Sequence, residues 1–131
     1  MKTRFPELTS IFRKLRAPGG CPWDRKQTHK TLLKYLKEES AEFIAEVKKG
    51  DASKMREELG DILLQVMFHA QIASEENKFD IEDVIDTLIK KLKRRHPHVF
   101  GKTKANTVRD VILNWNRIKA REKKALLKAK K

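Results

Sequence analysis

Two things are scarce in this sequence: cysteine and long apolar runs. Cys21 is the only cysteine, so no internal disulfide can form. No run resembles a membrane span, and none resembling a signal peptide follows Met1, so we expect a soluble cytoplasmic protein without a membrane partner. At 131 residues the chain is long enough to bury one helical core without a disulfide or a structural metal.

An excess of lysine and arginine makes the chain strongly basic. Its 31 Lys and Arg residues outnumber its 18 Asp and Glu residues, which gives a formal net charge of +13. A chain of this charge favours polyanionic ligands, such as nucleotides, nucleic acids or acidic surfaces. Net charge does not choose among these ligands, so the choice depends on local motifs.

The spacing of apolar residues predicts helices and no β-strand. The predicted helices cover residues 6–15, 29–49, 53–75, 81–95 and a last segment that begins at residue 108. Their predicted N-caps are Thr28, Asp51 or Ser53, Asp80 and Thr107. The second and fourth helices should face inward with Leu32, Leu33, Leu36, Phe43, Ile44 and Val47, and with Val84, Ile85, Leu88 and Leu92. The sequence therefore predicts one all-α domain over residues 1–131 that ends in a basic tail over about residues 120–131.

Prolines and glycines interrupt these helices at defined places. Two prolines and two glycines in residues 17–24 exclude a regular helix there, and Gly50 ends the second helix. His96–Pro97 ends the fourth helix. The run from His96 to His98 lacks helical ligand spacing and a third ligand, so we interpret it as a terminal loop and not as a transition-metal site. Cys21 has no partner base nearby in the sequence and is interpreted as a small loop residue.

Acidic residues recur at helical spacing in two successive predicted helices. Glu39 and Glu42 are three apart in the second helix, and Glu58 and Asp61 are three apart in the third. Each pair shares one helix face, and an antiparallel hairpin turning at Gly50 would bring the two pairs together. Four crowded carboxylates need a cation, and an oxygen-only ligand set suits Mg²⁺ or Mn²⁺ better than Zn²⁺. The alternative is a solvated acidic face with lysine partners.

The third predicted helix, residues 53–75, is apolar nearly all round. A single small bundle leaves part of such a perimeter uncovered. We therefore expect a homodimer, or a higher oligomer built from dimers.

Residues 11–122 resemble the MazG family of nucleoside triphosphate pyrophosphohydrolases. The resemblance is carried by Gly20-Cys-Pro-Trp-Asp24, Glu38-Glu39-x-x-Glu42, Glu58-Leu-Gly-Asp61, Arg94-Arg-His-Pro-His-Val-Phe100 and the helix with Trp115 and Lys119. It implies a four-helix-bundle-type domain with an additional terminal helix, assembled as a dimer. It also implies Mg²⁺-dependent hydrolysis of nucleoside triphosphates to monophosphate and pyrophosphate, by attack of water at the α-phosphorus, in the service of nucleotide-pool housecleaning.

The same resemblance assigns roles to individual residues. The implied metal ligands are Glu39, Glu42, Glu58 and Asp61, which together with Glu38, a candidate to orient or deprotonate the water, form the predicted catalytic set. The implied substrate-binding residues are Trp23, Gln27, Lys54, Glu57, Lys91, Arg95, Trp115 and Lys119. Lysines and arginines among these would bind phosphates, and the tryptophans would contact the base.

Several alternatives remain open at the level of the sequence. Trp115 lies among aliphatic residues as a core tryptophan would, and Trp23 could plug one end of the bundle. The basic tail could bind nucleic acid, with the acidic motif structural, although aromatic residues are few there. A catalytically inactive, regulatory member of the family is the third alternative. A narrower deoxynucleotide or phosphoribosyl-ATP hydrolase fits the Cys-Pro-Trp-Asp stretch less well.

Overall fold

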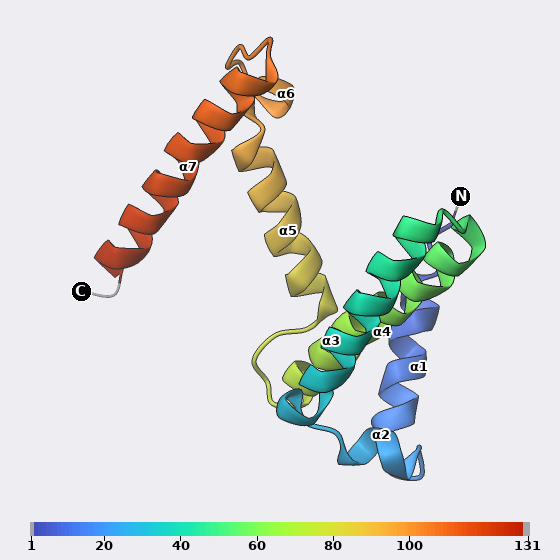
Figure 1. Ribbon diagram of the computed structural model, residues 1–131. Helices are drawn as coiled ribbons and strands as arrows, with labels where there is room; N and C mark the ends of the chain where they lie inside the picture. The colour runs from blue at the N-terminus through green and yellow to red at the C-terminus, as the bar shows by residue number, and fades with distance from the viewer. Residues whose placement is uncertain (1, 130–131) are drawn as a thin grey trace. The chain divides into compact units, whose positions relative to one another are not determined.

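The computed structural model describes residues 2–129, which form seven helices and no strand (Figure 1). The helices are α1 (Phe5–Arg16), α2 (Pro22–Lys26), α3 (His29–Lys49), α4 (Ala52–Glu75), α5 (Ile81–Arg95), α6 (Pro97–Phe100) and α7 (Val108–Ala129). The predicted all-α class is confirmed. The chain forms two compact units, one ending at Asp83 and the other beginning at Val84. No helix within residues 2–129 is both long and apolar enough to cross a membrane.

The first unit is built on an antiparallel hairpin of α3 and α4, which lie side by side (Figure 1). The Thr28 hydroxyl accepts a hydrogen bond from the backbone N–H of Thr31 at the start of α3. Gly50 ends α3 with φ at 74°, a left-handed conformation that glycine adopts at no steric cost. Asp51 then caps α4 by accepting from the Lys54 N–H. The predicted cap at Thr28, the helix end at Gly50 and the cap at Asp51 are confirmed, and Gly50 and Asp51 form the turn between the two helices.

The core of this unit lies where α1 and the start of α3 pack on α4. Phe12 and Phe68 meet edge to face with centroids 5.9 Å apart, and Leu32 is fully buried. The Arg16 guanidinium binds both carboxylate oxygens of Glu75 at 2.8 and 2.9 Å. Because it also donates to the backbone carbonyls of Asp24 and Gln27, Arg16 joins α1 to α4, to α2 and to the residue that follows α2.

Two short helices occupy places where the sequence predicted none. Pro22 begins α2 inside the stretch expected to exclude a regular helix, and Pro97 begins α6 inside the expected terminal loop. Both expectations were wrong for the same physical reason. Proline at the first helical position lacks an N–H that the helix would leave unpaired anyway, and its fixed φ suits helix entry.

The predicted inward stripes are only partly buried. Leu32 is inaccessible, but Leu33 and Ile44 expose 57% and 54% of their surface, and Val47 is exposed as well. Leu88 and Leu92 on α5 are also exposed. The spacing of apolar residues correctly predicts the apolar face of each helix. The apolar face of α3, however, is broader than the surface that α4 covers. The uncovered part is available surface on the single chain.

The second unit contains most of α5, together with α6 and α7. The first turn of α5 belongs to the first unit, where Asp80 and Asp83 exchange hydrogen bonds of 2.9 and 3.0 Å with each other's backbone N–H. In the second unit, the Thr107 hydroxyl caps α7 by accepting a hydrogen bond from the Asp110 N–H. Arg94 and Arg95 both bind the carboxylate of Glu122 on α7. The basic tail is helical as far as Ala129, and its last two residues lie outside the described chain.

Candidate functional site

Four carboxylates meet where α3 faces α4. Glu39 and Glu42 come from successive turns of α3, and Glu58 and Asp61 come from successive turns of α4. One oxygen from each residue lies within 4.8 Å of one oxygen from every other. The arrangement follows from i, i+3 spacing on two antiparallel helices. The structure thus brings together the four residues that the sequence singled out.

These carboxylates lack the partners that would balance their charge. One oxygen of Glu39 and one of Glu58 are buried without a hydrogen-bond donor among residues 2–129. Burial, followed by repulsion from Glu42 and Asp61, raises the pKa of Glu39 to about 7. Burial is also the first cause that raises the pKa of Glu58, and Glu42 is the second. Because their pKa values are raised, Glu39 and Glu58 hold protons more tightly than ordinary surface carboxylates do.

The donor set suits a hard divalent cation. All four side chains offer oxygen, and the cluster contains no thiol or imidazole, which favours Mg²⁺ or Mn²⁺ over softer metals. The two buried oxygens without donors are the atoms that such a cation would satisfy. The residues present therefore fit a bound Mg²⁺.

Trp23 lies in α2, and Gln27 follows α2 directly, just before α3 begins. The Gln27 amide donates to the Trp23 carbonyl at 3.0 Å and accepts from the Thr31 hydroxyl at 2.8 Å. Trp23 is 49% exposed and packs edge to face against Tyr35 and Phe68, with centroids 5.7 and 6.4 Å apart. A surface hollow beside these residues is also bordered by Lys30 and Lys34. About half of the ring surface is thus open to a ligand, and the rest packs against the protein. Both interpretations from the sequence, contact with a base and packing at the end of the bundle, therefore remain compatible with its position.

The other predicted residues of the first unit lie on exposed helix surface. Glu38, Lys54 and Glu57 are all exposed. Glu38 adjoins Glu39 in α3 without belonging to the four-carboxylate cluster. Glu57 adds to the repulsion on Glu58.

The second unit carries Lys91, Arg95, Trp115 and Lys119. The Arg95 guanidinium binds Glu122 at 3.0 and 3.4 Å, while Lys91 is half-buried. The Lys119 ammonium lies over the Trp115 ring, 5.7 Å from its centroid. Trp115 is 37% exposed, so it is not the fully buried core residue that its aliphatic neighbours suggested.

Three features escaped the reasoning from sequence. Glu122 holds both Arg94 and Arg95, and its isolation as an acid within a basic tail was the available signal. Tyr35 packs on Trp23. His29 and His69 share a 2.7 Å hydrogen bond between their Nδ1 atoms, and burial followed by the charge of His29 lowers the pKa of His69. The histidines are 40 residues apart, so no local pattern could have paired them.

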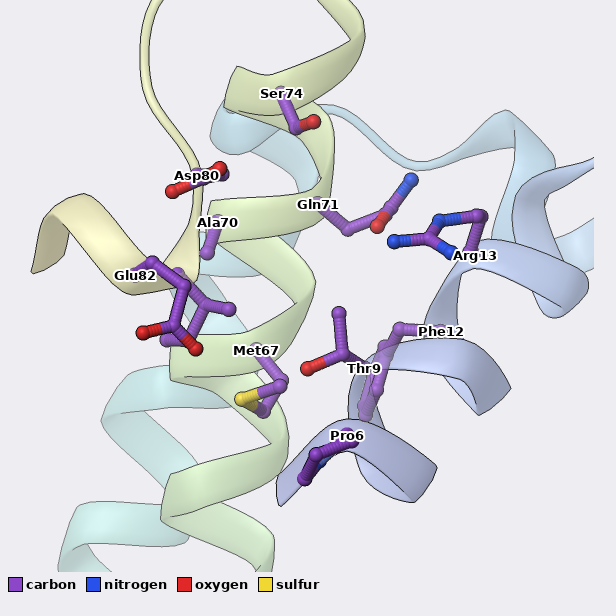
Figure 2. A pocket seen from close by; sticks show the side chains of 11 residues that line it. Pro6, Thr9, Phe12, Arg13, Met67, Ala70, Gln71, Ser74, Asp80 and Glu82 are labelled. Carbon is purple, nitrogen blue, oxygen red and sulfur yellow. The ribbon is translucent and has the colours of Figure 1, made fainter. Parts of the chain in front are cut away.

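A separate cavity of about 360 Å³ lies among α1, α4 and the start of α5 (Figure 2). Arg13, Thr9 and Phe12 line it from α1, and Gln71 and Ser74 line it from α4. None of the four clustered carboxylates contributes to this lining. The cavity is therefore distinct from the candidate metal site.

Comparison with known proteins gives a family match. Residues 27–100 match the model of the MazG nucleotide pyrophosphohydrolase domain, a range that includes all four carboxylates, Lys91 and Arg95. The chain is 56% identical over 119 residues to the nucleoside triphosphate pyrophosphohydrolase/pyrophosphatase MazG of Thermotoga maritima. It is 43% identical over 117 residues to the nucleoside triphosphate pyrophosphohydrolase of Escherichia coli strain K12.

These alignments cover nearly all of this chain but less than half of each relative. The alignments cover 91% and 88% of this chain but only 45% and 44% of the two relatives, so the chain spans less than half of their length. The crystal structure of a mazG-related protein from Thermotoga maritima matches with a TM-score of 0.72 and 31% identity. That match covers 88% of this chain and 98% of the solved one.

Proposed function

Because this chain belongs to the MazG nucleotide pyrophosphohydrolase family, we propose that it hydrolyses nucleoside triphosphates to nucleoside monophosphate and pyrophosphate. The observation that carries the proposal is the cluster of four carboxylates within 4.8 Å, two of whose oxygens are buried without donors. The names of the relatives at 56% and 43% identity support the same activity. Removal of unwanted nucleotides from the cytoplasmic pool is the cellular task that we propose.

Glu39, Glu42, Glu58 and Asp61 would hold Mg²⁺, and Mn²⁺ could replace it. When bound, the ion supplies positive charge to the phosphate oxygens and lowers the pKa of a coordinated water. The four side chains must be deprotonated to bind it, so the raised pKa of Glu39 makes metal binding compete with protons.

The remaining predicted residues act on the substrate and on the water. Glu38 is free of the cluster and would orient the attacking water or accept its proton. Lys54, Lys91 and Arg95 would bind the triphosphate and offset the charge of the leaving pyrophosphate. Trp23 and Trp115 would contact the base, and Gln27 would lie near its edge. Lys119 would bind phosphate, and Glu57 would assist binding. The half-exposed Trp23 ring supports this assignment.

A homodimer is the assembly that we propose. Helices α3 and α4 expose Leu33, Ile44, Val47, Leu59, Leu63, Leu64 and Val66 on the single chain. Single exposed apolar residues are normal on a protein surface, but this many on two adjacent helices are not. Burying them against a second copy of the chain is favourable. Light scattering of the purified protein should give twice the chain mass, and Leu33→Glu with Leu64→Glu should reduce it to the mass of one chain.

Identification of the products tests the activity. The purified protein is incubated with Mg²⁺ and each common ribonucleoside and deoxyribonucleoside triphosphate, and the products are separated by ion-exchange chromatography. Monophosphate and pyrophosphate in equal amounts support the proposal. Diphosphate and orthophosphate would place cleavage at the terminal phosphate and contradict it, and absence of any product would favour a regulatory domain.

A further inference from the structure

The second unit contains a cavity of about 390 Å³ that none of the predicted substrate-binding residues lines. Arg94 and Pro97 border it from α5 and α6, Thr103 comes from the following loop, and α7 supplies Asn114, Arg117, Ile118, Arg121 and Glu122. This volume falls within the range of about 300–1,000 Å³ that is usual for small-molecule sites. The cavity is therefore large enough for a small ligand.

The charge of the lining is strongly positive. Three arginines line the cavity together with one acid, Glu122. The carboxylate of Glu122 already receives hydrogen bonds from Arg94 at 3.1 Å and from Arg95 at 3.0 Å. Within residues 2–129, Arg117 and Arg121 have no acidic partner. Their two guanidinium groups are thus the unneutralised charges of this cavity.

The geometry of α7 aligns these donors. Arg117 and Arg121 are four residues apart, so their side chains leave the same helix face about 5–6 Å from each other. Asn114 precedes Arg117 by three residues and extends the same face with an amide. Guanidinium forks bind phosphate oxygens through two parallel hydrogen bonds. Two forks one helical turn apart suit an anion with more than one phosphate group.

We infer that the cavity formed by Arg94, Asn114, Arg117 and Arg121 binds a small anion with two or more linked phosphate groups. The buried Ile118 and the ring of Pro97 form its apolar wall. The lining shares no residue with the four-carboxylate cluster, whose members all belong to the first unit. The inference does not depend on the proposed hydrolysis, because it concerns binding without turnover.

The test is titration calorimetry of the full chain with inorganic pyrophosphate in EDTA. The double variant Arg117→Gln/Arg121→Gln is compared with Lys123→Gln/Lys124→Gln, which removes the same charge from α7 outside the cavity lining. Loss of two charge-assisted hydrogen-bonding groups should weaken binding about tenfold or more. The lysine pair should change the dissociation constant by less than about twofold.

Three results would overturn the inference. The first is no binding of pyrophosphate by the unaltered chain at millimolar concentration. The second is an equal loss of affinity in both double variants, which would show that pyrophosphate is attracted non-specifically by the positive charge of α7. The third is full retention in Arg117→Gln/Arg121→Gln with loss in Lys91→Gln, which moves the anion to the predicted substrate residues.

A further variant separates the loss of specific arginine contacts from an effect of misfolding. Arg117→Lys/Arg121→Lys keeps both charges and the helix propensity but removes the planar forks. If circular dichroism shows intact helices, weaker pyrophosphate binding by this variant supports specific arginine contacts. Unchanged binding by a folded lysine variant contradicts them.

Discussion

Replacing Glu58 by glutamine should stabilise the metal-free protein while abolishing its response to Mg²⁺. Glu58 has a buried oxygen without a donor, and its pKa is raised by burial and by Glu42. Glutamine keeps the shape of the side chain, removes the charge and adds an amide that can donate to the neighbouring carboxylates. If Glu58 instead contributed to the stability of the fold, its replacement would destabilise the metal-free protein.

The magnitude follows from the distances in the cluster. Two like charges 4.8 Å apart repel by about 1 kcal/mol in water and about 3.5 kcal/mol at an effective dielectric constant near 20. Glu58 has three such neighbours, but partial protonation of Glu39 reduces the repulsion near neutral pH. We expect Glu58→Gln to raise the melting temperature of the metal-free protein by a few degrees at pH 8 in EDTA, because the variant removes this repulsion.

Thermal unfolding followed by circular dichroism, with and without Mg²⁺, measures both effects. The unaltered protein should gain about 2.7 kcal/mol when Mg²⁺ is at 100 times its dissociation constant, and Glu58→Gln should lose most of that gain. Glu82→Gln is the matched control, because Glu82 is exposed in the first turn of α5 and lies outside the cluster. It should lower stability slightly, since an acid at a helix N-terminus is favourable. The reasoning is refuted if Glu58→Gln destabilises the metal-free protein, or if its Mg²⁺ response is retained.

Three further predictions concern other parts of the chain. The raised pKa of Glu39, about 7, means that the folded state favours the protonated form. This contribution to stability is fully present below the ordinary pKa of 4.5 and is lost as pH rises through about 7. Melting curves in EDTA from pH 5 to 8 should show this fall relative to Glu39→Gln, and a constant difference between the two proteins would contradict it. Arg16→Gln should cost about 1–3 kcal/mol in denaturant unfolding, because the Arg16 side chain is 10% exposed and binds Glu75 through both oxygens. Arg4→Gln, which breaks an exposed pair with Glu7, should cost less than about 0.5 kcal/mol, and equal costs would rule out this account of Arg16. Trp23→Ala should raise the KM for nucleoside triphosphate about tenfold with a smaller change in kcat, because base stacking contributes about 1–3 kcal/mol to binding. An unchanged KM in steady-state kinetics would leave Trp23 with a packing role.

Local signals in the sequence predicted most helix boundaries. Thr28, Gly50 and Asp80 act within three or four residues of themselves, so their chemistry is readable without knowledge of the fold. The carboxylate cluster was predictable for a related reason. Regular spacing fixes a helix face, and a short loop after Gly50 leaves an antiparallel hairpin as the simple arrangement. The metal-binding and substrate-binding roles of the individual residues remain predictions.

Features that depend on distant contacts were not predictable. Arg94 and Arg95 meet Glu122 across 28 and 27 residues, and no periodicity connects them. Burial of Leu33 and Ile44 failed as a prediction because an apolar stripe reports the face of a helix and does not report what covers it. The short helices α2 and α6 were missed because proline was interpreted as a helix breaker, although it also begins helices.

The most direct test of the central claim is hydrolysis of ATP with Mg²⁺ in water enriched in ¹⁸O, followed by ³¹P NMR of the products. Attack of water at the α-phosphorus puts the label in AMP and leaves pyrophosphate unlabelled, and this is the result that we predict, with no product in EDTA. Label in pyrophosphate means attack at the β-phosphorus, and label in orthophosphate means attack at the terminal one. Either of these labelling results would contradict attack at the α-phosphorus. Turnover that persists in EDTA would contradict the account of a Mg²⁺ site formed by Glu39, Glu42, Glu58 and Asp61.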